Sequence, residues 1–229
     1  MTGGAPDRGL LGQIRTRIVS WFLLKVVGIT AFIWGFFLIY FHLLRHPAYP
    51  VYEMPLTAVD RWLPFQPAAL GAYMSLWFYV GLPPGLLRSF RALISYGLWA
   101  LLLCLGGLLF FYYVPTTTPA YTGPGTDGSM YAVLKGLDAS GNACPSLHVA
   151  AAVFTGCWLD RLLRTMAAPR WPRALLLAWC VAIVYSTLAV KQHVLLDVLA
   201  GAAWGGIVAV ASMRWSAARL DCVPVKEGR

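Results

Sequence analysis

The chain is a series of apolar stretches, each about 20 residues long, separated by short polar or proline-rich connections. A helix of about 20 apolar residues matches the thickness of the hydrocarbon layer of a bilayer. Among all residues, 59% are hydrophobic and 12% are charged, whereas roughly a quarter are charged in an ordinary soluble domain. The sequence therefore predicts an integral membrane protein of the all-α class, folded as a polytopic helical bundle.

Six apolar stretches predict six transmembrane helices. They lie at about 18–41, 67–87, 93–113, 146–163, 174–190 and 194–213. The first has basic residues before it, as a signal peptide does, but it is long enough to span a bilayer and lacks an evident small-residue cleavage site, so we predict a retained helix. We expect a cytosolic leader over 1–17, a catalytic membrane domain over 18–213 with an outer loop over 114–145, and a cytosolic tail over 214–229.

The basic residues are distributed unevenly between the two sides of this layout. Of the 18 Lys and Arg residues, 13 fall on the side of both termini, four on the other side, and Lys25 in the first stretch. The formal net charge of +9 does not indicate a nucleic-acid partner, because such a partner requires cations clustered on one solvated face. The positive-inside rule places both termini in the cytosol. The start of the fourth stretch and the junction of the fifth and sixth then share the outer face.

Pro145-Ser146 before an apolar run predicts a helix start with Ser146 as the N-cap. Free N–H groups at such a start favour an anion such as phosphate, and His148 would lie in the first turn beside it. The alternative is that Ser146 only caps the helix and His148 is an ordinary interfacial histidine.

His193 and Asp197 are four positions apart, hence on one helix face. A carboxylate bonded to one imidazole nitrogen leaves the other free to attack or to take a proton. The alternative is an Asp favoured by the helix dipole beside an unrelated histidine. The predicted placement of His148 on the same side favours the catalytic interpretation. No second carboxylate or dense ligand spacing supports a metal, and the scattered cysteines predict neither a zinc site nor a disulfide.

Two further polar residues lie close to His193 in the sequence. Ser186, near the outer end of the fifth stretch, could donate to a phosphate oxygen, although a hydroxyl in a membrane helix more often bonds its own backbone carbonyl. Lys191 could neutralise phosphate, although a lysine that snorkels to the interface would give the same pattern.

These residues resemble the signature of the type 2 phosphatidic acid phosphatase superfamily, which includes lipid phosphate phosphatases, polyprenyl diphosphate phosphatases and vanadium haloperoxidases. Pro145-Ser146-Leu147-His148 resembles its Pro-Ser-Gly-His motif, and Ser186-Thr187-x5-His193-x3-Asp197 resembles its Ser-Arg-x5-His-x3-Asp motif. The resemblance covers roughly residues 60 to 213. The Pro-Ser-Leu-His form is most similar to the branch of inositol phosphorylceramide synthase-like phosphotransferases.

The resemblance implies that His193 is the nucleophile, that Asp197 orients it, and that His148 protonates the leaving alkoxide. It also implies that Ser146 and Ser186 bind phosphate oxygens, with Leu147 in the place of the motif's glycine. The chain departs from the family in lacking Lys-x6-Arg-Pro and in having Thr187 in place of Arg. Lys191, Lys135 and the N-terminus of the fourth helix would have to compensate for the missing cations.

We therefore expect a metal-independent enzyme without a cofactor, acting on a lipid phosphate or diphosphate from the bilayer through a phosphohistidine. Hydrolysis is our first hypothesis, and transfer of the phosphoryl group to a hydroxylated acceptor is the alternative. A non-catalytic binder or transporter of anionic lipids, or a bundle without a ligand, are further alternatives. Short loops and the absence of targeting signals predict a bacterial inner membrane, with the site facing the periplasm.

Overall fold

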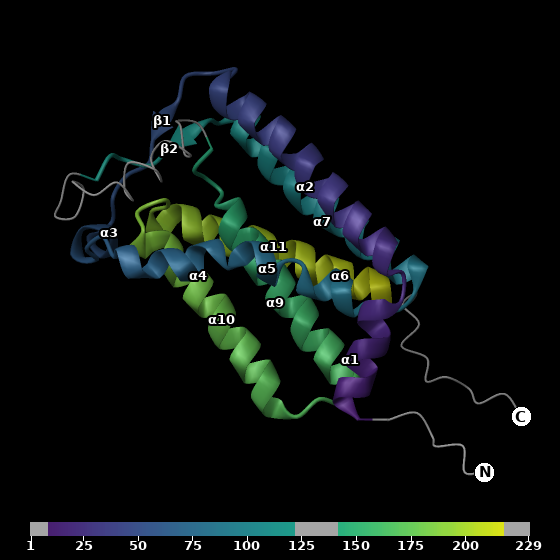
Figure 1. Ribbon diagram of the computed structural model, residues 1–229. Helices are drawn as coiled ribbons and strands as arrows, with labels where there is room; N and C mark the ends of the chain where they lie inside the picture. The colour runs from purple at the N-terminus through teal and green to yellow at the C-terminus, as the bar shows by residue number, and fades with distance from the viewer. Residues whose placement is uncertain (1–8, 122–141, 218–229) are drawn as a thin grey trace, which may run out of the picture.

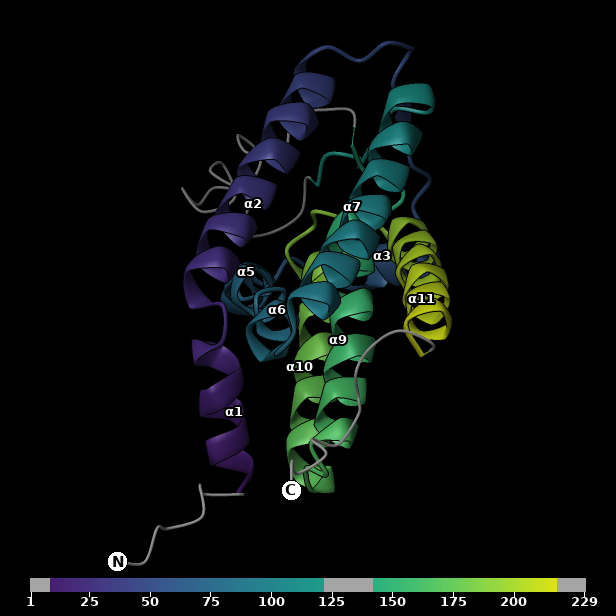
Figure 2. The same cartoon turned by 90° about the vertical axis from the view of Figure 1, so that its right-hand side faces the viewer.

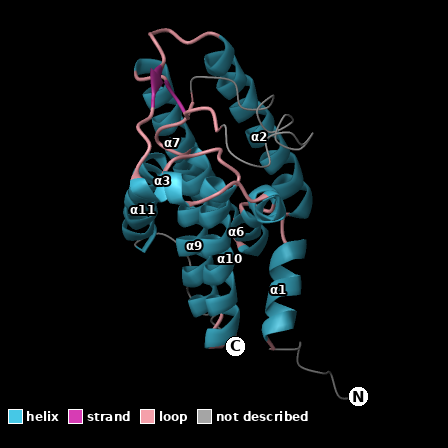
Figure 3. Cartoon of the chain, turned by 90° about the vertical axis from the view of Figure 1, so that its left-hand side faces the viewer, coloured by secondary structure: helices cyan, strands magenta, loops and turns pink. Residues whose placement is uncertain are grey.

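The computed structural model describes residues 9–121 and 142–217 and is mostly helical (Figure 1). The helices in chain order are α1 (Leu10–Val19), α2 (Phe22–Arg45), α3 (Ala58–Trp62), the 3₁₀ turn η1 (Pro67–Ala69), α4 (Leu70–Met74), α5 (Leu76–Tyr79), α6 (Leu82–Leu86), α7 (Phe90–Tyr113), α9 (Leu147–Thr165), α10 (Arg170–Ala189) and α11 (Leu195–Ala217). Two short strands, β1 (Tyr52–Glu53) and β2 (Thr116–Thr117), pair in parallel beyond the ends of α2 and α7 (Figure 3).

Four of the described helices are long and apolar enough to cross a membrane. They are α2, α7, α10 and α11. Many of their large apolar side chains are exposed, among them Leu98 of α7, Val181 of α10 and Ile207 of α11, as lipid contact requires. The chain thus has the helices of an integral membrane protein. α9 is also long, at 19 residues, but carries Asp160, Arg161 and Arg164 in its second half.

α9 is the centre of the bundle and packs against both α10 and α11 (Figure 2). One hydrophobic cluster joins Phe154 and Trp158 of α9 to α7 and α11, and a second joins Leu159 of α9 to α5 and α10. α11 approaches α9 very closely, since a Cβ on Gly205 would lie 2.3 Å from the carbonyl oxygen of Ala150. Small residues at this seam are needed for such a contact.

The predicted helix over 67–87 is divided into η1, α4, α5 and α6. Pro83 and Pro84 lie in the first turn of α6 and have no N–H to donate to the preceding turn, which accounts for the break between α5 and α6. The predicted helix over 18–41 is also displaced, because the chain breaks at Trp21, whose φ is 59°. The α1 segment lies partly in the stretch that the sequence indicated as a leader.

Lys25 explains this break. Its side chain is buried, and the Nζ ammonium donates to the carbonyl oxygens of Arg17 at 2.6 Å and Gly85 at 2.9 Å. A buried cation requires such acceptors. The break leaves the Arg17 carbonyl oxygen, near the end of α1, available for this contact, and Gly85, near the end of α6, supplies the second oxygen.

Candidate active site

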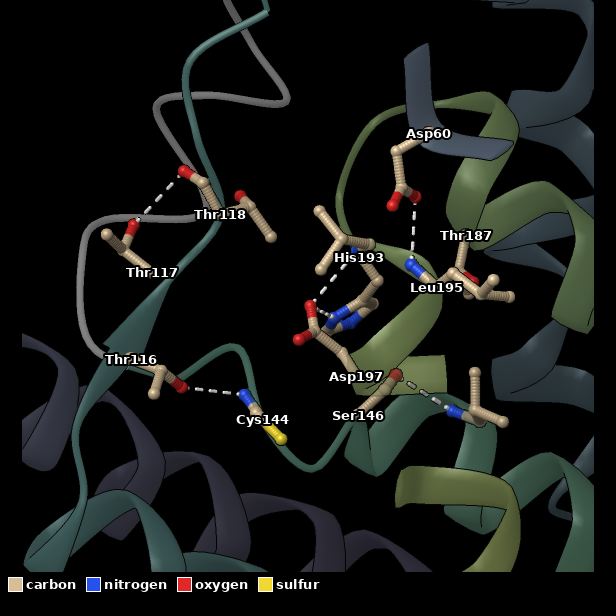
Figure 4. A network of polar contacts seen from close by, with 12 residues as sticks. Asp60, Thr116, Thr117, Thr118, Cys144, Ser146, Thr187, His193, Leu195 and Asp197 are labelled. Carbon is tan, nitrogen blue, oxygen red and sulfur yellow. Dashed lines mark hydrogen bonds and ion pairs between the residues drawn. The ribbon is translucent and has the colours of Figure 1, made fainter. Parts of the chain in front are cut away.

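The turn that leads into α9 places Ser146 at the helix N-cap, as the sequence indicates. The Ser146 Oγ accepts from the Val149 N–H at 3.2 Å, and the residue is fully buried. The turn itself is fixed by Thr116, whose Oγ1 accepts from the Cys144 N–H at 2.8 Å (Figure 4). The start of β2 and the turn before α9 are thus held together.

Ser146 is in direct contact with the start of α11. Its N–H donates to the carbonyl oxygen of Asp197 at 3.1 Å. A Cβ on Gly201 would lie 2.3 Å from the Ser146 carbonyl oxygen, so the helices meet backbone to backbone. The two stretches that carry the candidate motifs therefore lie at one place in the fold.

His193 and Asp197 form a buried pair at the junction of α10 and α11 (Figure 4). The His193 Nδ1 lies 3.5 Å from the Asp197 Oδ2, which also accepts from the Val194 N–H at 3.0 Å. Within the described residues, neither His193 Nδ1 nor Asp197 Oδ1 has a hydrogen-bond partner. A small approach would convert the contact into a hydrogen bond, because apo sites often hold such pairs at longer distance. A carboxylate beside Nδ1 favours the hydrogen there and leaves the lone pair on Nε2.

The His148 ring packs against two aromatic residues, Tyr73 of α4 and Trp77 of α5. Its ring stacks on Tyr73 with centroids 4.1 Å apart and meets Trp77 edge-on at 6.4 Å. The His148 Nε2 lies 3.1 Å from the Tyr73 carbonyl oxygen. Because a carbonyl only accepts, this bond places the hydrogen on Nε2 and leaves Nδ1 for proton exchange.

Sequence reasoning missed Tyr73 and Trp77. Their spacing of four places them on one helical face, which is the signal that could have indicated them. Aromatic residues are also enriched where membrane helices meet the interface, so this spacing alone does not single out the pair.

Ser186 and Leu147 face the protein in this structure. The Ser186 hydroxyl is fully buried and donates to the Ile183 carbonyl oxygen at 2.6 Å, which is the alternative that the sequence left open. The Leu147 side chain packs against Gly107 of α7, where a Cβ would lie 2.3 Å from it. Lys135, the other candidate cation, lies outside the described residues.

The Lys191 ammonium is directed at the segment around α3. It donates to the carbonyl oxygen of Asp60 at 2.9 Å and to that of Leu63, and it lies 5.1 Å from the centre of the Tyr121 ring. Burial lowers the pKa of Lys191 below its ordinary value, and the nearby Asp60 opposes this shift. The predicted phosphate cation is therefore engaged with protein carbonyls in this conformation.

Asp60 is a third residue to which the sequence gave no role. Its carboxylate is buried and accepts from the Leu195 N–H at the start of α11, at 2.9 Å. It also closes a capping box with Thr57 at the start of α3. The Thr57-x-x-Asp60 spacing is a sequence sign of such a cap, although it does not indicate the distant partner.

A family model described as the PAP2 superfamily matches residues 86–221, more than half of the chain. The matched range contains Ser146, His148, His193 and Asp197, and it excludes Asp60 and Tyr73. No curated protein and no solved structure matches the chain. The match confirms the resemblance of the motifs at the level of the superfamily.

Within the described ranges, no three His, Cys, Asp or Glu side chains form a group that could hold a metal.

Proposed function

The chain belongs to the PAP2 superfamily of phosphatases and phosphotransferases that act on lipid phosphates, and we propose that it hydrolyses a lipid phosphate or diphosphate through a phosphohistidine. The observation that carries this proposal is the junction of the two motifs. The Ser146 N–H donates to the Asp197 carbonyl, and the Asp197 carboxylate lies beside the His193 Nδ1. This junction supports the proposal because it brings the His193 imidazole, the Asp197 carboxylate and the first turn of α9 to one place.

In the first step, the His193 Nε2 attacks phosphorus and forms the P–N bond. The P–O bond to the lipid breaks, and protonated His148 gives the proton on its Nδ1 to the departing alkoxide. In the second step, His148 takes a proton from water, the water oxygen attacks phosphorus, and the P–N bond breaks. Asp197 stabilises the positive charge on His193 in both steps, as a carboxylate does for an imidazolium.

Charge on the phosphoryl oxygens must be balanced during transfer. The N-terminal end of the α9 dipole favours an anion there. Protonated His148 would add a positive charge, and Lys191 would contribute only after leaving the carbonyls of Asp60 and Leu63. Ser146 and Ser186 would bind phosphate oxygens by rotating their hydroxyls away from their present partners.

The proposal includes the orientation that the sequence indicates, with six spans, both termini in the cytosol and the site at the outer or periplasmic face. The structure supports it in one respect. The Asp160 ion pairs with Arg164 and Arg173 lie at the end of α9 opposite to Ser146. Basic residues thus gather at the end remote from the site, as the positive-inside rule requires of a cytosolic face.

The test is phosphate release from phosphatidate, phosphatidylglycerophosphate and a polyprenyl diphosphate by purified protein in detergent. We expect release by the wild type from at least one substrate and its loss in His193→Ala. His42→Ala is the matched control, because His42 lies at the exposed end of α2. Equal release by wild type and His193→Ala, or none by either, would instead favour a non-catalytic binder or transporter.

Transfer to a hydroxylated acceptor remains the second candidate, and Leu147 and Thr187 in place of the usual Gly and Arg favour it. The two reactions differ only in whether water or an alcohol attacks the phosphohistidine. Adding a polyol or a lipid alcohol to the same assay distinguishes them. Hydrolysis predicts inorganic phosphate at an unchanged rate, and transfer predicts a new phosphodiester or phosphomonoester product at the expense of phosphate.

A further inference from the structure

Asp60 has a buried carboxylate that binds a residue far away in the sequence. Its Oδ1 accepts from the Leu195 N–H, 135 positions later, at 2.9 Å. Its Oδ2 accepts from the N–H and the hydroxyl of Thr57 at 2.8 and 2.7 Å. Burial of a carboxylate is costly unless its oxygens are bonded. Both oxygens of Asp60 are bonded, and one of those bonds reaches the start of α11.

The same segment also holds the other side of the α10–α11 turn. The Lys191 ammonium donates to the main-chain carbonyl oxygens of Asp60 and Leu63. The Gln66 N–H donates to the carbonyl oxygen of Ala189 at 2.8 Å. Residues 60–66 therefore bind the chain before His193 and after it.

The turn between these attachments has a backbone conformation that needs support. Lys191 has a φ of 58°, in the left-handed region that a side chain disfavours. A residue in this conformation is strained and persists only where its surroundings hold it. The N–H groups of Gln192 and His193 both donate to the Thr187 carbonyl oxygen, which fixes the inner side of the same turn.

We propose that Asp60 is a positioning residue for His193, holding the α10–α11 turn so that the imidazole meets Asp197 and the phosphoryl group. The role in catalysis rests on the proposed function. Asp60 reaches the turn from a segment that lies before the range matched by the family model. The contact of 3.5 Å between His193 and Asp197 depends on the position of this turn, so loosening the turn separates the pair.

A purely structural role for Asp60 predicts a different result from a positioning role. Loss of folded protein lowers the amount of active enzyme without changing substrate affinity or the turnover of each folded molecule. Loss of positioning lowers kcat per folded molecule while KM stays close to that of the wild type. A misplacement of about 1 Å is enough to lower the rate about 10²-fold.

The experiment compares Asp60→Ala and Asp60→Asn with the control Asp160→Ala, which removes an acidic residue at the far end of α9. For each, kcat and KM are measured per folded molecule, and amide hydrogen exchange is followed over residues 186–197. In Asp60→Ala we expect kcat about 10²-fold lower, KM within about threefold, and faster exchange at residues 191–195. Asp60→Asn keeps an acceptor oxygen for the Leu195 N–H and should recover much of both properties.

Two results would overturn the proposal: exchange at 191–195 in Asp60→Ala equal to that of the wild type, or kcat equal to that of Asp160→Ala. If Asp60→Ala does not fold, Lys191→Met decides through the exchange measurement, because it removes another attachment between residues 60–66 and the turn. Exchange at 191–195 equal to that of the wild type in this variant would overturn the proposal. Absence of phosphate release from the wild type would refute the proposed function instead. The exchange data would then still show whether Asp60 holds the turn.

Discussion

The Ser146 N–H donates to the carbonyl oxygen of Asp197 at 3.1 Å, which joins the first turn of α9 to the first turn of α11. A helix start normally leaves its first N–H groups without an intrahelical partner. Here the N–H of the N-cap residue is satisfied by the other motif rather than by water. The distance between the two motifs is therefore fixed by backbone atoms, and it depends on how closely α11 approaches α9.

Gly201→Ala should separate the two motifs. The added Cβ would lie 2.3 Å from the Ser146 carbonyl oxygen, and backbone at that distance must move. We expect a loss of about 1–3 kcal/mol in the free energy of unfolding, as for other overpacked positions. The displaced turn should also lower kcat by about 10- to 100-fold. Thermal unfolding in detergent and the phosphate-release assay measure the two effects.

Gly206→Ala is the matched control for this prediction, because a Cβ there meets no atom within 4 Å. It should leave activity unchanged and leave stability unchanged or slightly increased, since Ala favours a helix over Gly. If Gly201→Ala behaves like Gly206→Ala in both assays, then the close approach of α11 to α9 does not determine the distance between the two motifs.

Asp197→Asn should lower kcat by about 10²- to 10⁴-fold with little change in fold. The Asn side-chain oxygen can still accept from the Val194 N–H, so the start of α11 keeps its cap. That oxygen then also faces the His193 Nδ1, as Oδ2 does in the wild type, but it carries no negative charge and no longer stabilises the positive charge that forms on His193. The measurement is kcat together with far-UV circular dichroism, with Asp160→Asn as the control. Full activity in Asp197→Asn would show that the reaction does not need the negative charge of Asp197 beside His193.

Thr116→Val should destabilise the turn that precedes α9. The Thr116 side chain is buried, and its Oγ1 is the acceptor for the Cys144 N–H, so the isosteric change leaves that donor unsatisfied. The expected cost is about 1–3 kcal/mol in the free energy of unfolding. The midpoint of thermal unfolding measures it, with the half-buried neighbour Thr118→Val as the control. Equal midpoints for the two variants would contradict the assignment.

The sequence predicts the long helices and the junction of the motifs well. The start of α9 at Ser146, the end of α10 and the start of α11 lie within one or two residues of their expected places. Each of these positions has a local cause, such as an N-cap or a polar group at the end of an apolar run. The spacing of His193 and Asp197 likewise depends only on helix geometry.

The contacts made by the connections could not be predicted in this way. The attachment of Asp60 to Leu195 joins residues far apart in sequence, and no local pattern specifies it. Lys25 and Lys191 both donate from their ammonium groups to carbonyl oxygens of residues far away in the sequence. The sequence indicated no partner for Lys25 and left phosphate binding or snorkelling open for Lys191. Such partners are set by tertiary packing, which depends on the arrangement of all the helices.

Lys191 should make stability depend on pH in the alkaline range. Burial lowers its pKa below the ordinary value of 10.5. Between the lowered pKa and 10.5, the unfolded chain binds more protons at this site than the folded chain, so the free energy of unfolding rises with pH. The unfolding midpoint of the wild type, relative to that of Lys191→Met, should therefore increase as the pH approaches 10.5. Lys191→Arg, which keeps its charge throughout, should show no such increase relative to Lys191→Met. A wild-type midpoint that falls relative to Lys191→Met over this range would mean that the attraction of Asp60 exceeds the cost of burial.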